Sequence, residues 1–252
     1  MKTGIVGLGH VGTAMNMLFP DAVVFDEPKC IGTRERINEC DLVFVCVPTP
    51  MRENGSCDTS IVEGVVSWLT VKCIVLRSTV PVGFVDFISN ETGKRIVFQP
   101  EYYGETVAHP LSDLKSRTWI TLGGKTEDVK LVVNAYQTVY NSDVRIRIVS
   151  AKTAELAKYM ENAFFATKVI FCNEFYDIAN EFGVDYNELR ETWLEDPRIG
   201  RSHTFVYHND RGFGGSCLPK DLSSIIFQAN EHSVNCDVLK AIKNKNEIYQ
   251  NN

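Results

Sequence analysis

A glycine-rich turn near the N-terminus limits the folds open to this chain more than any other feature. Residues 3–7 are a short apolar run, and residues 7–12 read Gly-Leu-Gly-His-Val-Gly. A helix-compatible stretch follows at 11–18, and a second apolar run at 22–25 ends at Asp26, 19 positions after Gly7. A dinucleotide-binding α/β domain typically begins with a strand, a glycine-rich turn of this kind, a helix and a second strand. An acidic residue follows about 20 positions after the glycine turn.

The chemistry of the turn indicates which cofactor it would bind. Glycines make the turn tight and let a pyrophosphate approach the backbone, while the helix N-terminus offers N–H groups and a positive dipole end. Asp26 would accept hydrogen bonds from ribose hydroxyls and repel a 2′-phosphate, so we expect NAD and not NADP. A glycine turn in some other α/β domain is the alternative.

Apolar runs continue to alternate with helical patterns as far as residue 150. Further strands are predicted at 41–47, 73–76, 95–98, 119–122 and 144–149, and a helix at 59–70. Near-continuous apolar runs are typical of strands that are buried on both faces of a parallel sheet. We therefore predict an α/β fold over residues 1–150, with a Rossmann-type, doubly wound, mostly parallel sheet.

Polar residues follow several of these strands, where an open parallel sheet binds its ligands. Thr49 follows one strand, and Ser78 and Thr79 follow the next. Glu101 and Glu105 lie beyond the strand at 95–98 and could bind sugar hydroxyls or act as a base. The alternative for each residue is a strand-ending turn or a solvated helix start.

From residue 151 onwards the pattern becomes helical. The longest helix is predicted at 151–182, with an apolar stripe along one face, and shorter helices at 185–194, 221–231 and 236–249. Lys158 and Asn162 share another face of the long helix, where a cation and an amide could hold an anion or an alkoxide. On a surface helix the same pair would have no role. We predict an all-helical domain over residues 151–252.

One loop of this helical part combines three glycines with a cysteine. Residues 212–221 read Gly-Phe-Gly-Gly-Ser-Cys-Leu-Pro-Lys-Asp. Glycines permit positive φ and close approach of a ligand, and Lys220 would favour the nucleophilic thiolate of Cys217. Taken alone, the stretch fits a glycine turn with a buried structural cysteine better than a nucleophile loop.

Composition excludes several classes of function. The net charge of −6 argues against a broad nucleic-acid surface, and no apolar run is long enough to span a membrane. The N-terminus lacks the pattern of a signal peptide, so we expect a cytoplasmic protein with reduced thiols. The eight cysteines contain no C-x-x-C pair and the five histidines do not cluster with them, so no metal site is predicted.

Seven stretches of the chain together resemble the UDP-glucose/GDP-mannose dehydrogenase family. In chain order they are 7–12, 46–50, 78–81, 100–102, 154–158 with Asn162, 196–200 and 212–221. The last is the most specific, because Gly-Phe-Gly-Gly-x-Cys-(Phe/Leu)-Pro-Lys-Asp is the family's nucleophile loop. The resemblance implies NAD-dependent, four-electron oxidation of a nucleotide-sugar C6 alcohol to the uronate, with conversion of UDP-glucose to UDP-glucuronate, for polysaccharide biosynthesis, as the expected reaction.

The resemblance also implies roles for individual residues. Cys217 would form a thiohemiacetal and then a thioester, Lys158 and Asn162 would steady oxyanions, Glu101 would be the base, and Asp221 and Thr79 would position water. The cofactor-binding residues would be Gly7, Gly9, His10, Val11, Gly12, Asp26, Pro48, Thr49, Ser78, Glu105 and Lys220. The substrate-binding residues would be Tyr102, Tyr103, Arg198, Gly212, Phe213 and Gly214, with Arg198 acting across a homodimer interface built on helix 151–182.

The chain also departs from the family pattern. Family members run on beyond the segment 236–249 into another nucleotide-binding α/β domain, so we expect a short form that lacks this domain. The usual Phe-Leu-x-Glu-Gly is replaced by residues 102–106, and Trp119 stands where an arginine is usual, with Arg117 nearby. Two alternatives stay open: a related β-hydroxyacid dehydrogenase, which uses a catalytic lysine and needs no cysteine, and a truncated, non-catalytic NAD-binding subunit that acts through dimerisation.

Overall fold

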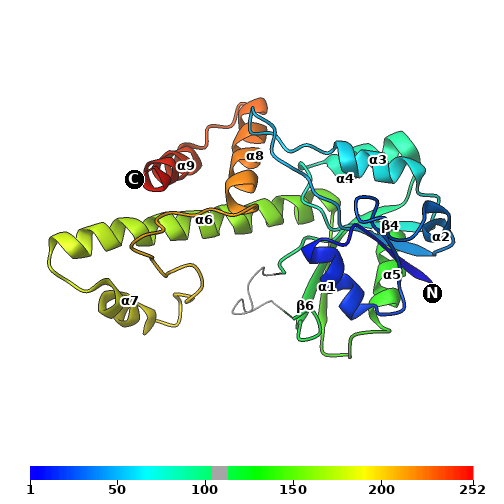
Figure 1. Cartoon of the computed structure of the whole chain (residues 1–252), viewed down its shortest axis with the longest axis horizontal. Helices are drawn as coiled ribbons and strands as arrows, with labels where there is room; N and C mark the ends of the chain where they lie inside the picture. The colour runs from blue at the N-terminus through cyan, green and yellow to red at the C-terminus, as the bar shows by residue number, and fades with distance from the viewer. Residues whose placement is uncertain (104–112, 252) are drawn as a thin grey trace. The chain divides into compact units, whose positions relative to one another are not determined.

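The structure, a computed structural model, describes residues 1–103 and 113–251. The chain divides into two compact units, which we describe separately. The first unit comprises Met1–Pro50 and Cys57–Lys158, and the second comprises Met51–Ser56 and Tyr159–Asn252. Helix α6, Ala151–Glu181, begins in the first unit and continues into the second (Figure 1).

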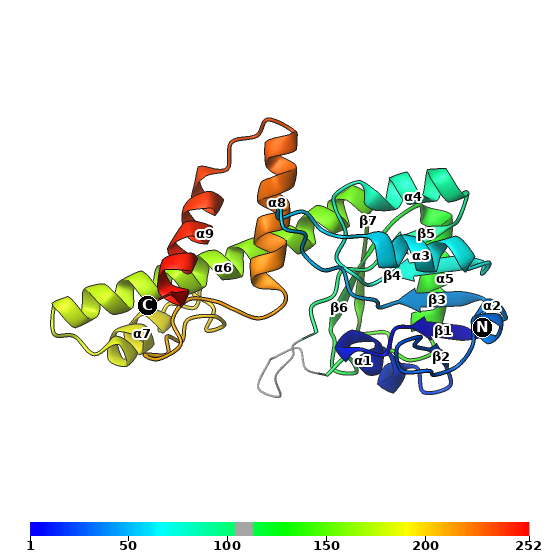
Figure 2. The ribbon, with the colours of Figure 1, turned by 45° about the horizontal axis from the view of Figure 1, so that its top comes forward.

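The first unit contains a seven-stranded sheet with the order β2-β1-β3-β4-β5-β6-β7. The strands are β1 Thr3–Val6, β2 Val23–Phe25, β3 Leu42–Val45, β4 Cys73–Leu76, β5 Ile96–Phe98, β6 Trp119–Gly123 and β7 Arg145–Val149. All neighbouring pairs are parallel except β5 and β6, which are antiparallel. The predicted mostly parallel sheet is therefore confirmed (Figure 2).

Helices cover both faces of this sheet, as in a doubly wound fold. They are α1 His10–Leu18, α2 Arg34–Asn38, α3 Ser60–Trp68, α4 Phe84–Thr92 and α5 Thr126–Tyr136. Because side chains alternate along a strand, Val43 and Val45 pack in one core with residues of α2, α3 and α4. Leu42 and Phe44 pack in a second core with residues of α1 and α5. Near-continuous apolar strands are required because both faces are buried.

The strand order places a topological switch point between β1 and β3. The chain leaves β1 for β2 on one side and returns for β3 on the other side. Ligands of open α/β sheets bind beyond the carboxyl ends of the strands at such a point. The segments that follow β1, β3 and β4 share this edge because the three strands are parallel neighbours.

The second unit is helical in its described residues, apart from one isolated bridge between Tyr207 and Asp210. Besides α6 it contains α7 Tyr186–Leu194, α8 Leu218–Glu231 and α9 Asp237–Gln250. Apolar residues of α6, α8 and α9 form one core with Phe213, and α6 forms a smaller core with Tyr186 of α7. Helix α8 begins three residues before the predicted 221, because Pro219 in its first turn favours a helical start.

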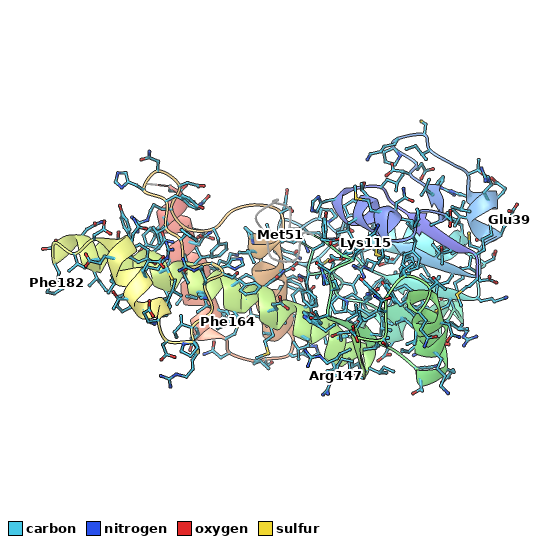
Figure 3. All side chains as sticks on the ribbon, turned by 90° about the horizontal axis from the view of Figure 1, so that it is seen from below. Glu39, Met51, Lys115, Arg147, Phe164 and Phe182 are labelled. Atoms are coloured by element: carbon cyan, nitrogen blue, oxygen red, sulfur yellow. The ribbon has the colours of Figure 1, made fainter. Side chains whose placement is uncertain are left out.

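The predicted apolar stripe of the long helix is exposed at most of its positions. Phe164 of α6 is 61% exposed, and Phe182, which directly follows the helix, is 79% exposed (Figure 3). Met160, Phe171, Phe175 and Ile178 are exposed too. The buried face of α6 in this unit is instead made of smaller residues such as Ala163 and Ala166. Exposed apolar residues on this scale mark interaction surfaces.

Candidate active site

The three glycines of the first turn have different surroundings. Gly7 has φ +89°, and a Cβ there would lie 2.8 Å from the Cys46 carbonyl oxygen. A Cβ on Gly12 would lie 1.7 Å from the Gly7 carbonyl oxygen, so α1 can approach β1 only with glycine at this position. Apart from its two chain neighbours, no described residue has an atom within 4 Å of where a Cβ on Gly9 would lie. The turn therefore combines tight packing with open space at the N-terminus of α1, which is what a pyrophosphate requires.

Asp26 follows β2 and holds the glycine turn in place. Its carboxylate accepts hydrogen bonds from the Leu8 N–H at 2.7 Å and the Lys29 N–H at 3.0 Å, and the side chain is buried. The Lys29 ammonium donates to the Leu8 carbonyl at 2.6 Å. His10 and Val11 begin α1, and the His10 ring lies 4.6 Å from the Tyr103 ring. The turn, the acid and the helix start thus form one connected group.

Hydroxyl groups join the segments that follow β3 and β4. Thr49 donates to the Thr79 carbonyl at 2.8 Å, and Ser78 donates to the Val47 carbonyl at 2.6 Å. Thr49 and Ser78 are buried, whereas Pro48 is exposed. In the described structure these two hydroxyl groups hold the segments after β3 and β4 together at the edge of the sheet. Such hydrogen bonds are compatible with a strand-ending turn and with a ligand-binding site.

Glu101 lies after β5 between two buried arginines. Its carboxylate contacts Arg77 and lies 3.2 Å from Arg117, and it accepts hydrogen bonds from the N–H groups of Tyr102 and Tyr103. Glu101 is only 9% exposed. Because its carboxylate accepts hydrogen bonds from the backbone of Tyr102 and Tyr103, it orders the segment that carries these two tyrosines. The predicted cofactor ligand Glu105 lies outside the described residues.

Lys158 is buried on α6, and its ammonium lies 4.9 Å from the centre of the Tyr102 ring. The Tyr102 ring in turn lies 5.1 Å from the Trp119 ring. A cation above an aromatic face is stabilised by the ring quadrupole, most strongly when water is excluded. The Trp119 and Tyr102 rings therefore support Lys158.

Glu155, which the sequence analysis did not single out, lies one turn before Lys158 and is fully buried. It accepts hydrogen bonds from the Gly83 N–H at 2.6 Å and the Val85 N–H at 2.9 Å, at the start of α4. Burial raises the pKa of its carboxyl, against the opposing effect of these two N–H groups. The sequence does contain one signal that could have identified Glu155: it is an acidic residue in the first turns of a mostly apolar helix.

In the second unit, Asp221 joins Asn162 of α6 to α8. Asp221 is 1% exposed, and it accepts a hydrogen bond from the Asn162 amide at 2.6 Å. The Lys220 ammonium donates to its other oxygen at 2.5 Å. The lysine that was expected to favour the Cys217 thiolate is thus bound by Asp221. This arrangement gives a fixed amide, a cation and a carboxylate on adjoining helices.

Cys217 is exposed and precedes α8 as its N-cap residue, where a helix dipole favours negative charge. Its sulfur lies 3.6 Å from the Ser216 hydroxyl. Cys46 and Cys73 differ, because burial raises the pKa of each thiol to about 12. All eight cysteines lie in the described residues and are free thiols. Cys217 therefore combines exposure with a helix N-terminus, as a nucleophile requires.

Asn246 of α9 holds the glycine loop that precedes Cys217. Its amide accepts from the Phe213 N–H at 2.7 Å and donates to the Phe213 carbonyl at 2.9 Å. Gly212 has φ +77°, and a Cβ there would lie 2.5 Å from the Asn246 amide oxygen. Phe213 is buried in the helical core, whereas Gly214 is exposed. No sequence pattern pointed to Asn246, which lies 33 residues from its partner Phe213.

The remaining candidate, Arg198, is exposed and bonded to Asp196, with its Nε 3.0 Å from both carboxylate oxygens. Within residues 1–103 and 113–251 there is no group of three His, Cys, Asp or Glu side chains placed to hold a metal ion. No helix in the same residues is long and apolar enough to cross a membrane.

The chain matches two models of one protein family. The UDP-glucose/GDP-mannose dehydrogenase family, NAD binding domain, matches residues 30–143, and the central domain of the same family matches residues 152–248.

Curated relatives agree with these matches. The chain is 30% identical over 230 residues to the putative UDP-glucose 6-dehydrogenase YtcA of Bacillus subtilis, covering 85% of this chain and 52% of the relative. It is 31% identical over 229 residues to a UDP-glucose 6-dehydrogenase of Pseudomonas aeruginosa, covering 84% and 49%. It is 30% identical to a GDP-mannose 6-dehydrogenase of Pseudomonas savastanoi pv. phaseolicola, covering 84% and 52%. The chain thus spans about half the length of these relatives.

Solved structures share the fold. A UDP-glucose dehydrogenase from Pyrobaculum islandicum superposes with a TM-score of 0.84 at 24% identity. The match covers 98% of this chain and 68% of that protein's chain. A ternary complex of GDP-mannose dehydrogenase from Pseudomonas aeruginosa has a TM-score of 0.69 at 24% identity, with 99% and 69% covered.

Proposed function

Because the chain belongs to the UDP-glucose/GDP-mannose dehydrogenase family, whose members are NAD-dependent nucleotide-sugar dehydrogenases, we propose that it oxidises a nucleotide-sugar C6 alcohol to the carboxylate. UDP-glucose and UDP-glucuronate are the proposed substrate and product, in the biosynthesis of a polysaccharide. The observation that carries the proposal is the exposed Cys217 thiol at the start of α8, one turn before the buried Asp221–Asn162 pair.

The reaction removes four electrons from one carbon, and bound NAD supplies the hydride acceptor in each of its two oxidations. After the first oxidation the Cys217 thiolate adds to the aldehyde carbon, forming a C–S bond while the carbonyl oxygen becomes an oxyanion. Loss of hydride from this carbon in the second oxidation leaves a thioester. Water then adds to the thioester carbonyl, the C–S bond breaks, and carboxylate, thiolate and protons are released.

The chain's polar residues have proposed roles around these steps. Lys158 and Asn162, four residues apart on α6, stabilise the oxyanions as a cation and an amide donor. Asp221 and Thr79 position the water. Glu101 is the proposed general base, and its oxygens also contact Arg77 and Arg117.

The glycine turn and the strand ends fit an NAD site. Open space at Gly9 admits the pyrophosphate, while the packing at Gly7 and Gly12 keeps the turn tight. Asp26 has further lone pairs for ribose hydroxyls besides its two backbone partners. The other cofactor and substrate residues named from the sequence keep their proposed roles. Residues 1–150 are the proposed cofactor-binding domain, and residues 151–252 are the proposed dimerisation domain.

The exposed stripe of α6 supports a homodimer. Large apolar side chains follow it at three-, four- and seven-residue steps: Met160, Phe164, Phe171, Phe175 and Ile178 on the helix, and Phe182 directly after it. A second copy of this helix is the proposed partner, and sedimentation of the purified chain tests the assignment. Phe164→Glu is expected to give a monomer, whereas Glu181→Gln at the end of the same helix is expected to leave the dimer intact.

Turnover of nucleotide sugars tests the activity. The purified chain is incubated with NAD and, in turn, UDP-glucose, GDP-mannose and UDP-N-acetyl-mannosamine, and NADH and acid are measured. The proposal predicts two NADH per sugar oxidised. Cys217→Ser is expected to abolish acid formation, whereas Cys236→Ser, at the N-cap of α9, retains it. NAD binding without NADH from any sugar would instead support a non-catalytic subunit.

A further inference from the structure

The carboxylate of Glu155 joins the start of helix α6 to the start of helix α4. Its two oxygens accept hydrogen bonds from the Gly83 N–H at 2.6 Å and the Val85 N–H at 2.9 Å, across 72 and 70 residues of sequence. The Glu155 side chain is fully buried. It therefore caps a helix to which it does not belong.

Capping α4 in this way costs more free energy than a local cap would. The N-cap residue of α4 is Gly83, which has φ +90° and no side chain that could accept a hydrogen bond. A serine or aspartate at an N-cap accepts such a bond while it stays close to water, whereas a fully buried carboxylate loses its hydration. The Glu155 carboxylate does one thing that a local cap would not do, because it also fixes α6 against α4.

The first turns of α6 are also packed tightly against their neighbours. Ala154 shares an apolar core with Val80 and Val85, which lie just before and within α4. A Cβ on Gly123, the last residue of β6, would lie 2.5 Å from the Ala154 Cβ, so α6 approaches β6 this closely only because residue 123 is glycine. The Glu155 hydrogen bonds thus act on a helix start that is already held against both β6 and α4.

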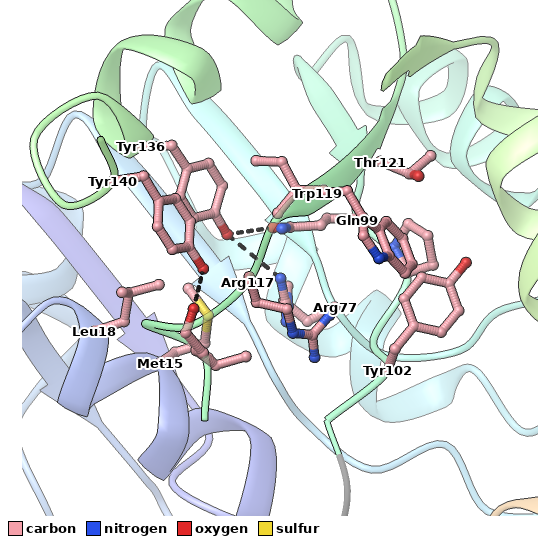
Figure 4. A pocket seen from close by; sticks show the side chains of 13 residues that line it. Met15, Leu18, Arg77, Gln99, Tyr102, Arg117, Trp119, Thr121, Tyr136 and Tyr140 are labelled. Atoms are coloured by element: carbon pink, nitrogen blue, oxygen red, sulfur yellow. Dashed lines mark hydrogen bonds between the residues drawn. The ribbon is translucent and has the colours of Figure 1, made fainter. Parts of the chain in front are cut away.

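The two elements that Glu155 joins carry residues with proposed roles in the reaction. Lys158, which is proposed to stabilise oxyanions, follows Glu155 by one turn of α6, and its ammonium lies 4.9 Å from the centre of the Tyr102 ring. The Tyr102 ring packs beside Trp119 of β6 (Figure 4). Thr79, which is proposed to position water, lies in the segment that leads into α4.

We propose that Glu155 is a positioning residue for the dehydrogenase reaction: by tying α6 to the start of α4, its carboxylate fixes the Lys158 ammonium relative to the segment that carries Thr79. This role rests on the proposed function, in which Lys158 meets the oxyanion and Thr79 meets the water. A displacement of about 1 Å between reacting groups can lower a rate by about 100-fold, so the relative position of these two residues has to be held.

Glu155→Gln tests this role, because the amide keeps the size of the side chain but places an NH₂ group against one of the two N–H donors. Steady-state kinetics with NAD and UDP-glucose are expected to show kcat lowered about 10-fold or more, while both KM values stay within about twofold. The matched control is Ile88→Val, which shortens a buried side chain of α4 and is expected to lower the melting temperature but to keep kcat. An unchanged kcat in Glu155→Gln, or an equal loss in both variants at a temperature where both are folded, would overturn the proposal.

A measurement that needs no turnover separates this role from the proposed function. In protein labelled with carbon-13 at the lysine Cε atoms, the Lys158 signal is shifted by the nearby Tyr102 ring and is assigned from its absence in Lys158→Arg. This signal is expected to move in Glu155→Gln and to stay in place in Ile88→Val. An unmoved signal in Glu155→Gln would refute the positioning role even if the chain oxidises sugars, and a moved signal would support it even if the chain oxidises none. If Glu155→Gln does not fold, Glu155→Asp is measured in its place, because its side chain is one methylene shorter and cannot reach both N–H groups unless α6 shifts.

Discussion

Replacing Asn246 by alanine is expected to loosen the loop that carries Cys217 without unfolding the second unit. The Asn246 side chain makes both of its described hydrogen bonds with the backbone of Phe213, at 2.7 and 2.9 Å. Arg211 and Gly212 stay bonded to Asn173 of α6 in the variant, so the start of the loop keeps its anchor.

The size of the effect follows from what the variant leaves behind. Phe213 is buried, so its N–H and its carbonyl would each lose a partner at a cost of about 1–3 kcal/mol. Alanine is a better helix former than asparagine by about 0.5 kcal/mol, which offsets part of this loss. Because Asn246 is 8% exposed and water reaches its edge, we expect a net destabilisation of about 2–4 kcal/mol.

Urea denaturation measures this loss, and amide hydrogen exchange of residues 212–217 locates it. The exchange of the Phe213 N–H is expected to accelerate by about 30-fold or more, which corresponds to 2 kcal/mol at 1.4 kcal/mol per factor of ten. Asn244→Ala is the matched control, because Asn244 is an exposed residue of the same helix. Equal stability of the two variants, or unchanged exchange at Phe213, would refute the reasoning.

Three further predictions concern the first unit. Gly12→Ala is expected to prevent its folding, because the new Cβ would lie 1.7 Å from a backbone oxygen, whereas Gly9→Ala is expected to fold and to bind NAD more weakly. Circular dichroism and NAD titration separate these outcomes, and a stable Gly12→Ala would contradict the packing argument. Burial raises the pKa of Tyr136 from 10 to about 12, so its contribution to stability is complete below pH 10 and is lost as the pH rises towards 12, by up to about 3 kcal/mol. Urea titrations are expected to show this loss in the unchanged protein and a smaller one in Tyr136→Phe; identical pH profiles would argue against it. Tyr102→Leu is expected to lower kcat about 5- to 30-fold through the lost contact with Lys158, while Tyr102→Phe retains it; equal kcat for both variants would exclude the ring from this role.

Sequence patterns predicted the sheet well because its strands are short, apolar and buried on both faces. The runs at 73–76 and 119–122 match β4 and all but the last residue of β6. Helices α2, α4 and α5 were not predicted. Helix α2 has five residues, and the buried residues of α4 are aromatic or β-branched, types with only moderate helix propensity. Packing against the sheet therefore decides that these segments are helical.

The candidate site was predictable where its residues follow one another in the chain. The glycine turn and the Cys217 loop depend on local backbone geometry, and their spacing is visible in the sequence. Arg77 and Asn246 carry no such signal. Each acts on a residue far away in the sequence, Glu101 and Phe213 respectively, and is brought to it only by the fold.

The sequence by itself determined the α/β plan, the NAD turn and the family, because each rests on residues close together in the chain or on motifs in a fixed order. Only the tertiary structure decided how these motifs are held. It placed two arginines against one buried carboxylate, set an asparagine against the loop that carries Cys217, and left the apolar stripe of α6 exposed. The physical reason is that charge balance and hydrogen-bond partners are settled by distances in space, which residue spacing does not specify.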